Sequence, residues 1–177
     1  MDKQEAIGFA GTTRITGFIP GTTDGASDRM DALTGVEFDT ATWNGAACSM
    51  KSARVVQLPA LVEIVSLEID GTKIKCGADQ QFAVVNYRTY DVSEGRVVLD
   101  TKRKLAFKRA RDLRSGDMIF CPGAKNKDKP SGLTFNRISK HRVQQLKEPE
   151  IMYLLTMNGA PFLLPGNIVT SSWKTHG

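Results

Sequence analysis

The stretch VEIVSLEIDGTKIKC, residues 62–76, decides the fold. Its first eight residues are rich in β-branched side chains and partly alternate apolar with polar positions, a pattern typical of a β-strand. Asp70 and Gly71 follow, and this pair favours a two-residue hairpin turn because both residues tolerate positive φ. The chain then returns with Ile74 and Cys76 on one face. We therefore predict a β-hairpin here.

Segments of similar character lie further along the chain, divided by clusters of turn residues. Gly, Thr, Ser and Asp crowd residues 16–28, and a second polar stretch covers residues 122–132; both predict loops. The one helical element that we expect is a short turn within residues 106–113. Many short strands separated by turns predict an all-β fold of the barrel or sandwich type with very little helix. Further candidate strands are residues 82–90, 96–99, 118–121, 138–143, 152–157 and 168–172.

The 177 residues suit a single domain, 1–177, with a core spanning about residues 8–172. The composition, 41% hydrophobic and 24% charged, is ordinary for a globular protein. No apolar run approaches the roughly 18 residues of a membrane span, so we expect no membrane association. The start, MDKQE, is polar and lacks the apolar run of a signal peptide. We therefore expect the protein in the cytoplasm or in an assembly built there, such as a virion.

Cysteine and histidine are scarce. Cys48, Cys76 and Cys121 make an odd and sparse set, which is not a disulfide framework. There is no C-x-x-C pair, and the histidines are His141 and His176, so the sequence predicts no metal site and no cofactor. We expect reduced and mostly buried thiols. His141 stands in a basic strand and is expected to be exposed.

Four segments, taken together, resemble the hedgehog–intein (Hint) family. The first begins at Gly8, where the family normally has a cysteine, and the second is a hairpin that leads into GADQ, where the family has Thr-x-x-His. The third resembles the family's leucine and Gly-Asp turn, and the fourth resembles its closing strands, which normally end in His-Asn. The resemblance implies a flattened, pseudo-twofold, all-β horseshoe that brings the chain ends together. The segments are Gly8–Ile15, Asp70–Phe82, Ala110–Asp117 and Met152–Ser172.

The chemistry of this family requires groups that the matching positions lack. Splicing requires a nucleophile at the first position, and Gly8 has no side chain. The family's acid–base histidine is replaced by Gln80, which can form hydrogen bonds but cannot titrate. The last step requires an asparagine that cyclises, and Ser171 and Ser172 stand there instead. We therefore predict no catalytic residue.

This combination suggests a structural or interaction module. Residues 1–7 precede Gly8 and residues 173–177 follow Ser172, so we expect no flanking polypeptide to be joined or released. Bacteriophages carry many inteins and small virion proteins, which makes a phage virion or assembly component the leading context. Such a protein is expected to associate with a protein partner or with copies of itself through a defined patch. Residual intein-type autoprocessing is the least favoured reading.

Nucleic-acid binding is the alternative, because positive charge is concentrated in one part of the chain. Residues 102–147 hold 14 Lys and Arg against three acids, a net +11, whereas the remainder carries −6. Clustered cations attract phosphates, and Phe107 and Tyr90 are candidates for base stacking. Such a charge run can equally be a solvated face. Within the basic segment 102–114 the candidate binding residues are Lys102, Arg103, Lys104, Lys108, Arg109 and Arg111.

Overall fold

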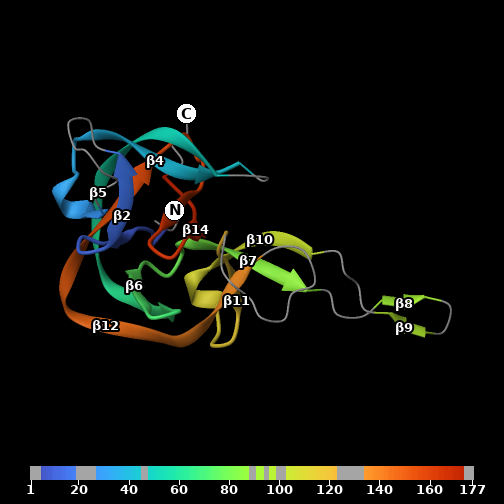
Figure 1. The fold of residues 1–177 in the computed structure, drawn as a ribbon. Coiled ribbons are helices and arrows are strands. Elements are labelled where there is room, and N and C mark those ends of the chain that lie inside the picture. The colour runs from blue at the N-terminus through green and yellow to red at the C-terminus, as the bar shows by residue number, and fades with distance from the viewer. Residues whose placement is uncertain are drawn as a thin grey trace.

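The structure, a computed structural model, describes residues 5–18, 27–44, 48–87, 91–93, 96–98, 103–122 and 134–173. β-Strands dominate, and the helical elements described are two single 3-10 turns, η1 (Met30–Ala32) and η2 (Ala110–Asp112). The all-β prediction is confirmed (Figure 1). The strands are β1 (Phe9–Ala10), β2 (Arg14–Phe18), β3 (Ser27–Arg29), β4 (Glu37–Trp43), β5 (Cys48–Ile69), β6 (Thr72–Cys76), β7 (Gln81–Tyr87), β8 (Asp91–Ser93), β9 (Arg96–Val98), β10 (Arg103–Arg109), β11 (Met118–Phe120), β12 (Phe135–Thr156), β13 (Phe162–Leu164) and β14 (Ile168–Thr170).

Two strands of 22 residues each, β5 and β12, form the frame of the molecule. They pair antiparallel from Ile69↔Ile138 to Arg54↔Thr156, and both curve strongly (Figure 1). The register of the ladder shifts between Gln145 and Met152 of β12. Pro149 of β12 and Pro59 of β5 both lie in this irregular stretch. Proline has no N–H to donate, so it is tolerated in a sheet mainly at such interruptions.

The predicted hairpin connects β5 to β6. Ile69 pairs with Thr72, and the two turn residues, Asp70 and Gly71, have φ of 46° and 78°. Positive φ at both positions is what a type I′ turn requires. The hairpin prediction is therefore confirmed, and the turn sets the register that places Cys76 opposite Val65.

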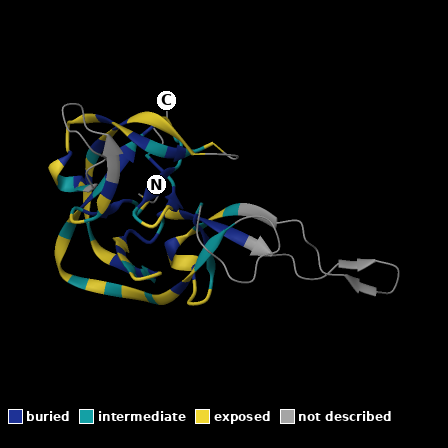
Figure 2. Cartoon of the chain, viewed as in Figure 1, coloured by how far each residue is buried: buried dark blue, intermediate teal, exposed yellow. Residues whose placement is uncertain are grey.

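The smaller strands complete the sheet on both sides of this frame. β7 pairs with β10, β11 and β14, while β14 pairs with β13, β13 with β4, and β4 with β5. The core between them holds five fully buried phenylalanines, and Phe9 contacts Phe82 and Phe162 edge to face with centroids 6.1 Å apart. Figure 2 shows the buried residues concentrated on the strands in the middle of the molecule. The five are Phe9, Phe38, Phe82, Phe120 and Phe162.

Three sequence predictions about elements need correction. Residues 106–109 belong to strand β10, because they pair with residues 81–84 of β7, and only Ala110–Asp112 form a helical turn. The candidate strands 138–143 and 152–157 are parts of one strand, since β12 continues through the irregular stretch. The loop expected at 16–28 is shorter, because β2 extends to Phe18 and β3 begins at Ser27. Most of the loop expected at 122–132 lies outside the described residues.

Candidate functional site

Gln80 stands at the centre of the candidate site. It ends the short turn that follows β6, and its side chain is fully buried. Its Oε1 accepts a hydrogen bond from the backbone N–H of Gly8 at 3.0 Å. Its Nε2 donates to Thr170 Oγ1 at 2.9 Å and to the Ser171 carbonyl at 2.8 Å. One amide side chain therefore links the beginning of the fold to its end.

Gly8 occupies a position that admits no side chain without strain. Its φ is +104°, a conformation that L-residues with a Cβ rarely adopt. A Cβ built there would lie 3.0 Å from Leu58 Cδ1, 3.1 Å from the Tyr153 carbonyl oxygen and 3.2 Å from Met152 Cβ. The backbone of β12 thus approaches residue 8 closely, and glycine is the residue that fits.

The segment before Gly8 is held by the same turn. The Ala6 N–H donates to Asp79 Oδ2 at 2.9 Å, and the Asp79 N–H donates to the Ala6 carbonyl at 2.8 Å. The Gly77 N–H donates to the Gly8 carbonyl at 2.9 Å. A Cβ on Gly77 would lie 2.2 Å from the Ala6 carbonyl oxygen, so this close approach requires glycine. Residues 6–8 are therefore clasped along the turn 77–80.

The closing strand supplies the other half of the site. Thr170 donates its hydroxyl proton to the Gln81 carbonyl at 2.7 Å, which leaves its oxygen lone pairs facing Gln80 Nε2. Ser171 Oγ lies 3.3 Å from the same Nε2. Ser172 is 8% exposed, and its hydroxyl is buried with no hydrogen-bond partner among the described residues. The structure thus brings Gly8, Gln80 and Ser171 together, whereas the buried Ser172 hydroxyl forms no hydrogen bond with Gln80.

Comparisons with solved structures agree on one architecture. The PabCDC21-1 intein is 14% identical and covers 97% of this chain and 100% of its own, with a TM-score of 0.65. A DnaB intein from Synechocystis sp. PCC 6803 is 17% identical and covers 95% and 99%, with a TM-score of 0.62. A bacterial intein-like domain from Clostridium thermocellum is 15% identical and covers 97% and 100%, with a TM-score of 0.63.

This chain has the Hint fold. The sequence identities are low, so the likeness establishes the architecture alone, and it confirms the fold that the four sequence segments implied. No family sequence model and no curated protein sequence matches the chain.

Within this Hint fold, two residues of the site had escaped the sequence reasoning. Asp79 accepts a hydrogen bond from the Ala6 N–H, and the Thr170 hydroxyl oxygen accepts one from Gln80 Nε2. Asp79 immediately precedes Gln80, and Thr170 immediately precedes Ser171. A polar residue next to a motif residue is too common in sequences to have identified Asp79 or Thr170 as part of the site.

Two of the thiols are buried and hold their protons. Burial raises the pKa of Cys76 far above its ordinary value. Burial likewise raises the pKa of Cys121 to about 11, although hydrogen bonds from Asn136 oppose the shift. The expectation of mostly buried thiols is therefore confirmed for Cys76 and Cys121, whereas Cys48 is exposed.

Three cations of the basic segment form ion pairs, with Asp112 inside the segment and with Asp79 and Asp117 outside it. Lys108 Nζ lies 3.5 Å from Asp117, and Arg109 lies 3.5 Å from Asp112 and 3.7 Å from Asp79. Arg111 also pairs with Asp79. Lys102 lies outside the described residues, and for Arg103 and Lys104 the structure describes only their backbone place in β10. Nucleic-acid binding by this segment stays a prediction.

His141 corrects a smaller expectation. It is half-buried rather than exposed, and its Nε2 lies 2.9 Å from the Ala110 carbonyl. The ring therefore fastens the turn η2 to β12 and lies outside the Gly8–Gln80 site. Among the described residues, no group of His, Cys, Asp or Glu is arranged to hold a metal ion. No helix in the same part of the chain has the length and apolarity to cross a membrane.

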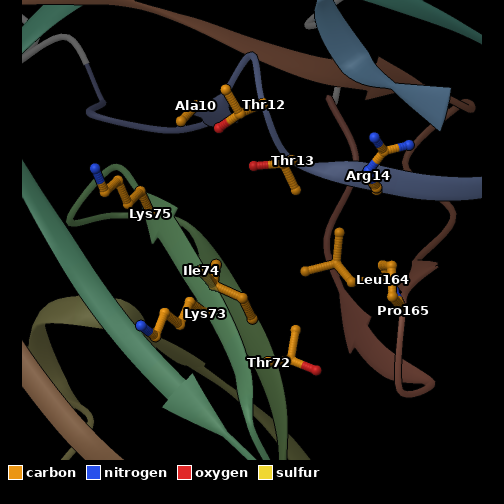
Figure 3. Close-up of a pocket in the computed structure, with 10 residues that line it drawn as sticks. All are labelled: Ala10, Thr12, Thr13, Arg14, Thr72, Lys73, Ile74, Lys75, Leu164 and Pro165. Atoms are coloured by element: carbon orange, nitrogen blue, oxygen red, sulfur yellow. The ribbon is translucent and has the colours of Figure 1, made fainter.

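A hollow of about 360 Å³ lies next to the first strands of the Hint fold. Its walls come from residues 10–14, from β6 and from Leu164 and Pro165 (Figure 3). The part of β6 that lines it is Thr72, Lys73, Ile74 and Lys75, all labelled in Figure 3. The lining combines apolar side chains with threonine hydroxyls and with the cations Arg14, Lys73 and Lys75.

Proposed function

We propose that this Hint-fold domain neither splices nor cleaves a polypeptide and that it acts as a protein-binding module. The observation that carries the proposal is Gly8. The reaction of this fold's splicing members begins with a side-chain nucleophile on the first residue, and Gly8 has none. The positive φ of Gly8 and its crowded surroundings also favour glycine over any residue with a side chain.

Gln80 supports the same conclusion. A histidine in this place could donate a proton to the nitrogen of the scissile peptide bond. Protonation makes that nitrogen a good leaving group. The Gln80 amide has no proton to give at ordinary pH, and its oxygen only accepts from the Gly8 N–H. The hydrogen bond therefore involves no proton transfer. It positions the peptide bond before Gly8 without activating it.

The nearest thiol offers no substitute nucleophile. Cys76 pairs with Phe9 in the β1–β6 register, one residue from Gly8. Its thiol is fully buried, and the raised pKa keeps it protonated at neutral pH, whereas attack requires the thiolate. The C-terminal end offers Ser171 and Ser172, and serine has no side-chain amide with which to form a succinimide. Both ends thus lack a chemical first step.

A domain of this shape without chemistry is useful through its surface. We propose a protein partner or a second copy of the chain as its ligand, with a bacteriophage virion or assembly as the context. The reasons for that context are the abundance of inteins and small virion proteins in phages. The structural support for a binding role is the pair of 22-residue strands β5 and β12, many of whose residues are exposed.

Intact mass tests the absence of cleavage. The purified chain is incubated with a strong thiol at neutral pH, and a tryptic digest of the same sample verifies that fragments of the relevant sizes are detected. We expect one species at full mass, because Gly8 has no side-chain nucleophile and Ser171 and Ser172 have no side-chain amide that could cyclise. A fragment that ends at Ile7 or at Ser172 contradicts the proposal.

A further inference from the structure

Two neighbouring rows of the β6–β5–β12 ladder carry cations at both of their ends. In the first row, Lys73 and Lys140 lie opposite Glu68 on either side. In the second row, two residues along, Lys75 and Arg142 lie on either side of Ser66. Residues two apart in a strand share a face, so both rows project from the same side of the sheet. We call these four cations the basic rows.

The basic rows are exposed. Lys73, Lys75 and Arg142 are exposed, and the Lys140 side chain is 78% accessible. Lys73 and Lys75 also contribute to the lining of the hollow beside β6 (Figure 3). The face is therefore free within this chain to meet another molecule, as far as the described residues extend.

The basic rows differ from the basic segment in how their charge is balanced. Lys108 pairs with Asp117, and Arg109 and Arg111 pair with Asp79 of the turn 77–80. In the rows, Glu68 is the one carboxylate, and it lies 3.7 Å from Lys140. The other three cations form no ion pair among the described residues. Four cations against one acid leave a net +3 on a small sheet surface.

We propose that the basic rows bind an extended, acidic segment of a protein partner. This inference rests on the proposed binding function and names the chemistry of the partner. The two rows are about 7 Å apart along the strands, which is also the interval between side chains on one face of an extended peptide. Carboxylates at alternate positions of such a peptide therefore match the lysine pair on β6 or the Lys140–Arg142 pair on β12.

Two features favour carboxylates on a peptide over a phosphate backbone. Glu68 lies between Lys73 and Lys140, where its charge repels a continuous line of phosphates. The spaced carboxylates of a peptide can instead contact the cations on one side of Glu68. None of the six residues in the rows is aromatic, so this face has no platform on which bases can stack. Nucleic acid is accordingly one of the alternatives that the experiment decides.

The experiment measures fluorescence anisotropy of a labelled peptide that alternates Glu and Thr, titrated with the full chain at low and physiological salt. The same peptide with Gln in place of Glu tests the need for carboxylates. The double variant Lys75→Gln/Arg142→Gln removes one cation from each side of Ser66. Its matched control is Lys51→Gln/Arg54→Gln, which removes two exposed cations from the far part of β5. Thermal midpoints of both variants verify that they fold.

We expect the Lys75/Arg142 variant to bind the acidic peptide roughly ten-fold more weakly, with little change in the control. The Gln peptide should not bind, and physiological salt should weaken the binding of the acidic peptide. Equal losses in both variants show a net-charge effect and overturn the proposal. Tighter binding to a random-sequence DNA duplex than to the peptide also overturns it. Failure here leaves the intact-mass result untouched, so the two proposals fail separately.

Discussion

At the scale of single residues, the surroundings of Gly8 favour glycine. A Cβ there would lie within 3.2 Å of atoms of Leu58, Met152 and Tyr153. The Tyr153 carbonyl and Met152 Cβ belong to the backbone or lie next to it, so they cannot move aside without shifting β12. A side chain at this position should therefore cost stability.

Gly8→Ala tests this crowding, with Gly166→Ala as its matched control. Both glycines have positive φ, +104° and +85°, but a Cβ at Gly166 would meet only ordinary contacts at 3.5 Å and beyond. We expect Gly166→Ala to cost about 1 kcal/mol of unfolding free energy for its backbone strain alone. Gly8→Ala should cost about 2–4 kcal/mol, because overpacking adds to the strain. Urea denaturation measures both, and equal costs contradict the crowding argument.

At the scale of elements, the turn 77–80 explains why part of the site was predictable and part was not. The turn residues Asp70 and Gly71 and the alternation of β5 and β6 are local signals, so the hairpin followed from the sequence. The order of motifs located Gly8, Gln80 and Ser171. The hydrogen bonds that join them connect residues 72 and 91 positions apart, and no local pattern encodes such contacts.

The same limit explains the errors at other elements. The short helical turn expected within residues 106–113 overlaps the end of β10, whose Ala, Lys and Arg residues have high intrinsic helix propensity. Pairing with β7 along its whole length overrode that local preference. The ion pairs of Lys108 and Arg111 depend on Asp117 and Asp79, which the fold brings together from separate turns. The sequence therefore did not show that these cations have carboxylate partners in the folded chain.

Gln80→Leu tests the clasp between the chain ends. Leucine has a similar volume but leaves the buried Gly8 N–H without an acceptor and Thr170 without its donor. An unsatisfied buried polar group costs about 1–3 kcal/mol, so we expect a loss of about 2–4 kcal/mol of unfolding free energy. Gln57→Leu, at an exposed position of β5, is the control and should change little. Matching denaturation midpoints for the two variants contradict the role of Gln80.

At the scale of the whole molecule, the core protects two thiols and links stability to pH. The folded-state pKa of Cys121 is raised to about 11 from an ordinary value of 9.0. The stability that comes from keeping this thiol protonated is fully present below pH 9, and it is lost as the pH rises toward 11, because the unfolded chain releases the proton first. Cys76 acts in the same direction.

Denaturation of the parent and of Cys121→Ala at several pH values tests this linkage. We expect the parent's unfolding free energy to fall more steeply between pH 9 and 11, since the variant lacks one of the two protected thiols. Labelling with an aromatic disulfide provides the control: the native chain should react at Cys48 alone, and the unfolded chain at all three cysteines. Parallel pH profiles contradict the protection of Cys121.

The pairing of β5 with β12 also determines how the molecule reaches this state. The ladder joins Arg54 to Thr156, 102 residues apart, and at its other end it joins Ile69 to Ile138, 69 residues apart (138 − 69). Closing so large a loop costs chain entropy before any pairing energy returns, so folding should be slow, in the range of about milliseconds to seconds. Until β5 and β12 pair, each of these 22-residue strands has an unpaired edge. Refolding yield should therefore fall as the chain concentration rises, because neighbouring chains compete for those edges.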